Sequence, residues 1–177
     1  MLRIAIADDH AMFVDGIESI LSTEESIQVV DKCFNGESVF TMLKNKDIDV
    51  LLLDINLPDM SGIEVAKRLY VEYPNVKVIA LSMYNEESIV SEMLKNGAQG
   101  YILKNTGRTE LVQAIETVAL GQTYFSKEVT ETIMGGLLKK SVPKKSDLFL
   151  IPKLSLREKE VLALIIKEYT TPEIAEK

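Results

Sequence analysis

Several residue types and patterns are scarce in this sequence. Its single cysteine, Cys33, excludes an internal disulfide, and the apolar stretch around it predicts a buried, inert thiol. No apolar run approaches the ~20 residues of a membrane span, and no glycine-rich phosphate-binding motif occurs. Residues 1–3 lead straight into an apolar segment, so we expect no signal peptide. These absences favour a cytoplasmic protein without a membrane partner.

Charge is unevenly distributed along the chain. The net charge is −7, from 20 Lys and Arg against 27 Asp and Glu. Residues 1–138 carry 11 basic and 21 acidic side chains, whereas residues 139–177 carry 9 and 6. An acidic N-terminal part and a mildly basic C-terminal part indicate two modules with different partners. The basic excess is too small to indicate DNA binding by itself.

Short apolar segments alternate with amphipathic helical stretches as far as Gly121. The spacing of Phe13, Ile17 and Ile20 is typical of one helical face, and Gly97 is well suited to end a later helix. The expected strands are residues 2–7, 27–34, 50–53, 76–81 and 100–103. Five strands that alternate with helices in this way predict a doubly wound, parallel α/β sheet.

Acidic residues follow two of the predicted strands. Asp8 and Asp9 follow the first, and Asp54 ends the apolar third strand. The carboxyl ends of parallel strands meet at one edge of the sheet, so these side chains should share a cleft. Neighbouring carboxylates raise one another's pKa unless a cation lies between them, and oxygen ligands with room for water suit Mg²⁺. Simpler alternatives are that Asp54 caps the next turn and that Asp8 and Asp9 favour a helix N-terminus.

The fourth and fifth predicted strands also end in polar residues. Ser82 follows the fourth strand and Lys104 the fifth, with Tyr101 inside the fifth. Taken singly, Ser82 fits a strand-end cap, Lys104 a surface lysine and Tyr101 a half-buried strand residue. Polar groups at four strand ends are better explained by one shared site than by separate coincidences.

With these residues in this order, roughly residues 1–120 resemble the receiver domain of two-component response regulators. The resemblance implies a flavodoxin-like sheet with strand order 2-1-3-4-5 and makes Asp54 the phosphoacceptor. It implies that Asp9, Asp54 and the backbone carbonyl of Asn56 hold Mg²⁺, with Asp8 close by through a water molecule. An Asp carboxylate can form an acyl phosphate, and a bound cation with nearby donors supplies the charge stabilisation that phosphoryl transfer needs.

The same resemblance assigns Ser82 and Lys104 to the incoming phosphoryl group. Ser82 and Tyr101 form a switch in which Tyr101 turns inward on phosphorylation and a homodimer is favoured. The phosphohistidine donor belongs to a sensor histidine kinase, so His10 is expected only to begin a helix beside the acidic site. The chain is expected to be a phosphoacceptor signalling protein rather than an enzyme, although it takes part in its own phosphorylation and dephosphorylation. Many receivers have a cis proline after the lysine, whereas this chain has Asn105, and a cis bond without proline costs about 2.5–4 kcal/mol.

Beyond Gly121 the pattern changes. Ser126 is expected to cap a sixth helix, which Gly135 and Gly136 weaken near its end. Residues 139–152 contain lysines and prolines typical of a flexible linker.

The last stretch has the pattern of a helix pair. Ser155 and Glu158 fit a capping box, and Pro172 suits the first turn of a second helix. Residues 173–176 resemble the beginning of the scaffold helix of the LuxR-type helix-turn-helix, so that the whole chain resembles the NarL/FixJ family of transcriptional regulators. The recognition helix should follow Lys177. We therefore expect promoter DNA to be a partner of the complete protein but not of this truncated chain.

The expected domains are a receiver at residues 1–121, a helix and linker at 122–153, and the start of a LuxR-type DNA-binding domain at 154–177. An amphipathic tail is the simpler alternative for the last segment. Two other classes of protein remain open. A phosphatase of the haloacid dehalogenase type also has Asp after an apolar strand, but it needs a second Asp where this chain has Asn56. A receiver-type adaptor would act by protein contact alone, without DNA binding.

Overall fold

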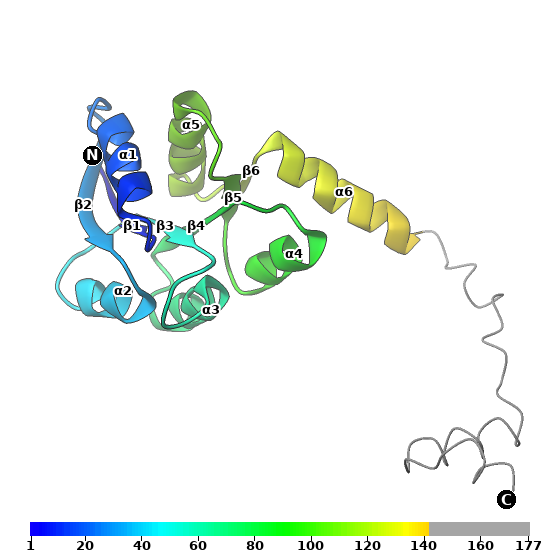
Figure 1. The fold of residues 1–177 in the computed structure, drawn as a ribbon, viewed down its shortest axis with the longest axis horizontal. Coiled ribbons are helices and arrows are strands. Elements are labelled where there is room, and N and C mark those ends of the chain that lie inside the picture. The colour runs from blue at the N-terminus through cyan, green and yellow to red at the C-terminus, as the bar shows by residue number, and fades with distance from the viewer. Residues whose placement is uncertain (142–177) are drawn as a thin grey trace, which may run out of the picture. The chain divides into compact units, whose positions relative to one another are not determined.

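The structure is a computed structural model, and it describes residues 1–141. Within those residues, six parallel strands form one sheet in the order β2-β1-β3-β4-β5-β6 (Figure 1). The strands are β1 (Leu2–Ala7), β2 (Ile27–Cys33), β3 (Val50–Asp54), β4 (Lys77–Ser82), β5 (Gly100–Leu103) and β6 (Tyr124–Phe125). The flavodoxin-like α/β fold and the order of the first five strands are as predicted.

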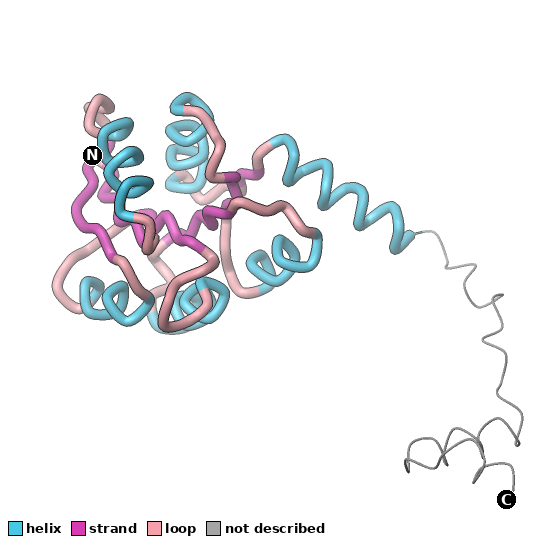
Figure 2. The backbone as a smooth tube through the Cα atoms, viewed as in Figure 1, coloured by secondary structure: helices cyan, strands magenta, loops and turns pink. Residues whose placement is uncertain are grey.

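Helices cover both faces of this sheet (Figures 1 and 2). They are α1 (Ala11–Leu21), α2 (Gly36–Leu43), α3 (Gly62–Glu72), α4 (Glu87–Lys95), α5 (Arg108–Ala119) and α6 (Lys127–Ser141). Helices α1 and α5 pack on one face, and α2, α3 and α4 pack on the other. This arrangement follows from the alternation of strand and helix, because each crossover lays a helix on a face of the sheet.

The core explains the apolar runs of the sequence. Leu51 and Leu53 of β3 face α2, α3 and α4, whereas Val50 and Leu52 face α1 and α5, and all four are fully buried. A strand covered on both faces needs apolar side chains at every position. Cys33 is buried as predicted, and burial raises the pKa of its thiol to about 11. None of the helices in the described part is long and apolar enough to cross a membrane.

The connection from α5 to α6 contains a strand that the sequence does not predict. Gly121 adopts φ +81°, a conformation that glycine readily takes. The chain then pairs Tyr124 with Gly100 and Phe125 with Tyr101, which adds β6 to the edge of the sheet. A strand of two residues is too short to show periodicity, so the sequence predicts only an apolar step here.

Helix α6 differs from expectation at both ends. Ser126 precedes it, but the Ser126 hydroxyl has no hydrogen-bond partner among the described residues, and Thr130 N–H donates instead to the Ser126 carbonyl at 2.9 Å. The helix continues through Gly135 to Ser141, beyond the predicted start of the linker at residue 139. A glycine costs a helix only about 1 kcal/mol, which is too little to end the helix by itself. The rest of the expected linker and the segment 154–177 lie outside the described residues.

Candidate functional site

Four strand ends bring polar side chains to one edge of the sheet. Asp8 follows β1, and Lys104 follows β5. Asp54 and Ser82 are the last residues of β3 and β4. Asp8, Asp54 and Ser82 are 0%, 2% and 3% exposed. The structure therefore gathers these predicted residues at one place, as the carboxyl ends of parallel strands require.

The ammonium group of Lys104 lies between the two buried carboxylates. Its Nζ is 2.7 Å from Asp8 Oδ2 and 3.0 Å from Asp54 Oδ2. Burial lowers the pKa of Lys104, but the bonds to both carboxylates outweigh burial and hold that pKa above its usual value. The ring of Phe13, from α1, lies 5.0 Å from Nζ. The lysine is therefore a fixed cation inside the pocket.

Asp54 lacks full charge compensation. Burial raises the pKa of its carboxyl group, and the negative charge of Asp8 adds to this effect. The Lys104 ammonium and the backbone N–H of Asn56 act in the opposite direction, yet the pKa stays above its usual value. One cation that faces two carboxylates leaves net negative charge in the pocket, so a further cation is favoured there.

The acidic pocket has the donor set of a metal site. Ligand atoms of Asp8, Asp9, His10 and Asp54 all lie within 4.8 Å of one another. Oδ2 of Asp8 and Oδ2 of Asp54 are buried, and apart from their ion pairs with Lys104 they accept no hydrogen bond from the described residues. Asp9 is 38% exposed and opens the pocket to water. Clustered carboxylate oxygens with solvent on one side fit a hard divalent cation of the Mg²⁺ type.

His10 lies at the rim of this pocket. It precedes α1, as predicted, and its side chain is 67% exposed. Its Nδ1 is 2.8 Å from Asp9 Oδ1 and 3.1 Å from Asp8 Oδ1, and its backbone N–H donates to Asp8 Oδ1 at 3.0 Å. The sequence predicts the position of His10 beside the site but not this contact, because ring orientation does not follow from spacing along the chain. The three consecutive polar residues Asp8, Asp9 and His10 are the sequence signal that could have indicated this contact.

The chain folds back sharply after β3. Asn56 forms an isolated bridge with Ser61, and Gly62 N–H donates to the Ile55 carbonyl at 2.8 Å. A Cβ atom at residue 62 would collide with the carbonyl oxygen of Asp54, so glycine is required there. The loop that contains Asn56 is therefore closed tightly beside Asp54.

Tyr101 lies inward, behind the strand ends. It is fully buried, and its hydroxyl donates to the Tyr84 carbonyl at 2.7 Å. The backbone N–H of Tyr84 donates in turn to Ser82 Oγ at 3.0 Å. Burial raises the pKa of the Tyr101 hydroxyl. Sequence resemblance predicts an inward turn on phosphorylation, but the ring already lies inward here, where its hydroxyl donates to a backbone carbonyl.

The residue after the lysine does not disturb the site. No peptide bond in the described part of the chain is cis, so the bond between Lys104 and Asn105 is trans. The backbone N–H of Lys104 donates to the Ser82 carbonyl at 2.8 Å, and Nζ still reaches both carboxylates. Proline is therefore not needed to place the lysine.

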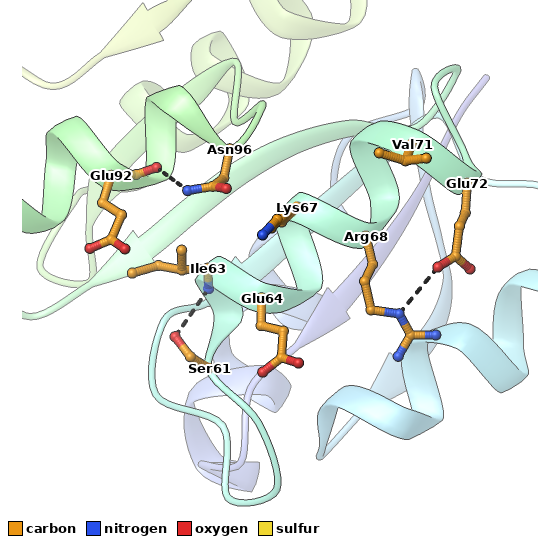
Figure 3. A pocket seen from close by; sticks show the side chains of 9 residues that line it. All are labelled: Ser61, Ile63, Glu64, Lys67, Arg68, Val71, Glu72, Glu92 and Asn96. Atoms are coloured by element: carbon orange, nitrogen blue, oxygen red, sulfur yellow. Dashed lines mark hydrogen bonds and ion pairs between the residues drawn. The ribbon is translucent and has the colours of Figure 1, made fainter.

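A separate hollow of about 650 Å³ lies between α3 and α4 (Figure 3). Two of its polar groups are paired with near neighbours: Arg68 Nε lies 3.2 Å from Glu72 Oε1, and Asn96 Nδ2 donates to the Glu92 carbonyl at 2.8 Å. Figure 3 shows these side chains spread along the two helices rather than directed at one point. The hollow therefore directs fewer polar groups at a bound charged ligand than the acidic pocket does.

Comparisons with known proteins agree with the fold and with the family that the sequence resembles. The family model described as response regulator receiver domain matches residues 4–116. The oxygen regulatory protein NreC of Staphylococcus carnosus (strain TM300) is 35% identical over 180 residues, which cover 99% of this chain and 82% of that protein.

Two solved structures are similar as well. The signal receiver domain of the response regulator NarL from Mycobacterium tuberculosis has a TM-score of 0.66 and 34% identity, over 68% of this chain and 98% of that one. The response regulator RcsB of Salmonella typhimurium has a TM-score of 0.73 and 27% identity, over 99% of this chain and 82% of that one. That structure concerns the conformational dynamism of RcsB for DNA interaction.

A doubly wound sheet whose strand ends hold three carboxylates and a buried lysine defines a signal-receiving domain. Such domains partner with histidine kinases. The chain belongs to the response regulator receiver domain family, among the NarL/FixJ-type regulators that control transcription in response to phosphorylation. This confirms the family that the sequence resembles.

Proposed function

We propose that Asp54 accepts a phosphoryl group from the phosphohistidine of a sensor histidine kinase. The proposal rests above all on the buried pocket in which Lys104 Nζ pairs with both Asp8 and Asp54. A carboxylate oxygen of Asp54 forms a bond to phosphorus while the bond from phosphorus to the kinase nitrogen breaks. The electron pair of that bond leaves with the imidazole, and an acyl phosphate remains on Asp54.

Asp9, Asp54 and the backbone carbonyl of Asn56 are the proposed Mg²⁺ ligands, with Asp8 linked through a water molecule. When bound, Mg²⁺ offsets the carboxylate charge and polarises the phosphoryl oxygens. The clustered oxygen donors support this assignment, and so does the tight loop that holds the Asn56 backbone close to Asp54.

Lys104 and Ser82 are the proposed contacts of the phosphoryl group. The Lys104 side chain is only 8% exposed, and a cation held at such a buried position stabilises phosphoryl oxygens more strongly than in water. The Ser82 hydroxyl accepts from Tyr84 N–H at the end of β4, and a hydroxyl can also donate a hydrogen bond to a phosphoryl oxygen.

The output is proposed to be a switch through Ser82 and Tyr101 that favours a homodimer on phosphorylation. We assign the receiver to residues 1–121, the helix and linker to 122–153 and the start of a LuxR-type DNA-binding domain to 154–177. Family membership and the DNA interaction of RcsB support promoter DNA as a partner of the complete regulator. In this role the chain acts as a phosphoacceptor rather than an enzyme, in the cytoplasm where promoter DNA lies.

Asp54 should gain one phosphoryl group when the chain is incubated with acetyl phosphate and Mg²⁺. Intact-mass spectrometry measures the gain. Asp54→Asn should abolish it, because the amide cannot form the acyl phosphate, whereas Asp47→Asn, a change at an exposed acid, should leave it unaltered. Undiminished phosphorylation of Asp54→Asn would refute the assignment.

A further inference from the structure

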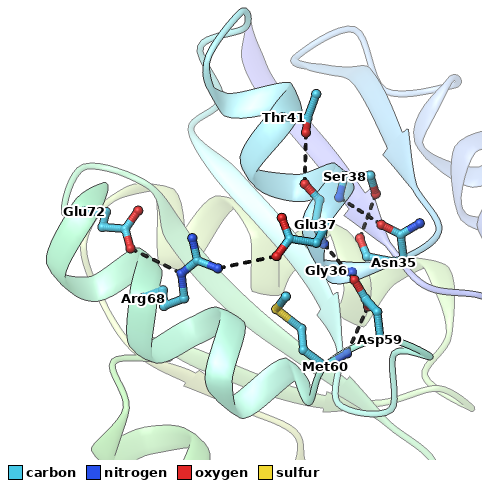
Figure 4. A network of polar contacts seen from close by, with 9 residues as sticks. All are labelled: Asn35, Gly36, Glu37, Ser38, Thr41, Asp59, Met60, Arg68 and Glu72. Carbon is cyan, nitrogen blue, oxygen red and sulfur yellow. Dashed lines mark hydrogen bonds and ion pairs between the residues drawn. The ribbon is translucent and has the colours of Figure 1, made fainter.

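The loop between β3 and α3 is bound to the start of α2 by one carboxylate (Figure 4). Oδ1 of Asp59 accepts from Gly36 N–H at 2.7 Å, and Oδ2 accepts from Glu37 N–H at 2.9 Å. Oδ1 also accepts from Met60 N–H, within the loop itself, at 3.0 Å. Asp59 therefore connects two segments that lie more than twenty residues apart in the sequence.

This connection is additional to the ordinary cap of α2. Asn35 already caps the helix, because its side chain accepts from Ser38 N–H at 2.9 Å. Burial is the largest single influence and raises the pKa of Asp59, but the backbone N–H donors around it, led by Gly36 and Glu37, together outweigh burial and lower that pKa below the usual value. A charged carboxylate at a helix N-terminus also interacts favourably with the helix dipole. Asp59 is thus a strong, ionised second acceptor that comes from another part of the chain.

The base of the same loop is fixed as well. Asn56 and Ser61 bridge across it, and Gly62 N–H donates to the Ile55 carbonyl. The loop therefore has a closed base beside the phosphoacceptor and a tip held by Asp59. Asn56, whose carbonyl is the proposed metal ligand, belongs to this closed base and lies three residues before Asp59 in the chain.

A second contact keeps α2 and α3 in register. The guanidinium of Arg68, on α3, lies 3.7 Å from the ring centroid of Phe40 on α2. Its approach to Glu37 Oε1, at 3.9 Å, is a solvent-exposed pair that contributes little to this contact. Figure 4 shows Arg68 between Glu37 and Glu72 and Asp59 at the N-terminus of α2. The start of α2, to which Asp59 binds, therefore belongs to a helix that is itself held against α3. Helix α2 is thus a fixed support for the tip of the loop.

We propose that Asp59 is a positioning residue for the cation site. By fixing the loop tip to α2, it holds the Asn56 backbone where its carbonyl can bind the metal, although Asp59 itself touches neither metal nor phosphoryl group. The inference rests on the proposed function, since it concerns the same site. Partners that orient metal ligands in this way are worth about 10–100-fold in metal affinity in other proteins.

The test compares the full chain with Asp59→Ala and Asp59→Asn. Mg²⁺ affinity is measured by calorimetry, and the phosphorylation rate with acetyl phosphate is followed over a range of Mg²⁺ concentrations. We expect Asp59→Ala to weaken Mg²⁺ binding about tenfold. Its phosphorylation should need more Mg²⁺ for half-maximal rate but reach the wild-type rate at saturation. Asp59→Asn keeps one acceptor oxygen, so its Mg²⁺ affinity should lie between that of wild type and that of Asp59→Ala.

Two control variants separate positioning from simpler effects. Asn35→Ala removes the local cap of α2 and should lower thermal stability without changing Mg²⁺ affinity. Glu37→Gln removes a neighbouring negative charge, whose side chain is 71% exposed, without releasing the loop. It should also leave Mg²⁺ affinity unchanged.

Wild-type Mg²⁺ affinity in both Asp59 variants would overturn the proposal, and so would an equal loss in Asn35→Ala or Glu37→Gln. If Asp59→Ala does not fold, Asp59→Asn alone decides between these outcomes. A wild-type chain that binds no Mg²⁺ would instead refute the proposed metal site itself, so the two failures are distinguishable.

Discussion

Lys104 is the residue on which the acidic pocket depends. Its single charge faces two carboxylates that are 0% and 2% exposed. Removing one partner of a buried ion pair usually costs about 3–5 kcal/mol, because the remaining charge is left unpaired. Lys104→Met should therefore lower the free energy of unfolding by about that amount at pH 7. Urea denaturation measures the change, and a loss below about 1 kcal/mol would show that the carboxylates do not depend on the lysine.

The same variant should respond to pH in a defined direction. Burial already raises the pKa of Asp54 in the folded chain, and without Lys104 it should rise further, while the unfolded chain keeps a pKa of about 3.9. Between the unfolded and the folded pKa, the folded state binds more protons, so stability falls as pH rises through that window. The deficit of Lys104→Met relative to wild type should thus shrink when unfolding is measured at pH 5 instead of pH 7. A deficit that is constant over this range would contradict the raised pKa.

Asp9 should matter to the metal more than to the fold. Asp9→Asn removes one of three neighbouring negative charges, so repulsion in the metal-free pocket falls and thermal stability should stay equal or rise. Loss of a charged oxygen ligand should weaken Mg²⁺ binding on the order of tenfold. Calorimetric titration and thermal unfolding test the two parts separately. Unchanged affinity would remove Asp9 from the ligand set.

At the scale of elements, the segment from β4 to α4 is held by two hydrogen bonds in series. Tyr101 donates to the Tyr84 carbonyl, and Tyr84 N–H donates to Ser82. The tyrosine of β5 and the serine of β4 therefore act on one short stretch of backbone. A change at Ser82 on phosphorylation would reach Tyr101 through this stretch without any large movement of the ring, which is already buried.

Tyr101→Phe tests this connection. The variant leaves the Tyr84 carbonyl without its donor, so it should cost about 1 kcal/mol of stability. Amide hydrogen exchange should become faster in residues 83–86 while the central strand β3 stays protected. Tyr70→Phe, at a tyrosine that is 67% exposed, serves as the control and should change neither quantity. Equal exchange in Tyr101→Phe and wild type would show that the hydroxyl does not hold the loop.

At the scale of the whole molecule, phosphorylation should change the oligomeric state. The phosphoryl group can favour a dimer only by binding better to the dimer-competent conformation. Ser82→Ala should therefore still be phosphorylated on Asp54 but dimerise less than wild type. Light scattering before and after treatment with acetyl phosphate measures both chains. If the variant dimerises like wild type, the switch does not pass through Ser82.

The sheet and the acidic pocket could be predicted because both follow from local patterns. Leu51 to Leu53 show that β3 is covered on both faces, and the end of β3 then places Asp54 at the edge where ligands bind. Strand ends recur at regular intervals, so Asp8 and Lys104 could be assigned to the same edge from the sequence alone. Residues that are far apart along the chain therefore become neighbours in space when each ends a parallel strand of the sheet.

Contacts that depend on side-chain direction could not be predicted in this way. The Asp59 carboxylate reaches a helix that begins twenty-three residues earlier, and no period or motif marks such a pair. The ring of His10 turns toward Asp9, and the hydroxyl of Tyr101 donates to the backbone carbonyl of Tyr84 in the loop after β4. Each depends on which rotamer the packed structure leaves open, which sequence spacing does not determine.

The short strand β6 has a mechanical consequence. It joins β5 directly to α6, since Phe125 pairs with Tyr101 and Ser126 N–H donates to the Tyr101 carbonyl at 3.2 Å. A helix of 15 residues is about 22 Å long. A tilt of about 10° at its base displaces its far end by about 4 Å at that length. A small rotation of α6 at its base would therefore become a displacement of several ångströms at Ser141, on the order of the 4 Å given above.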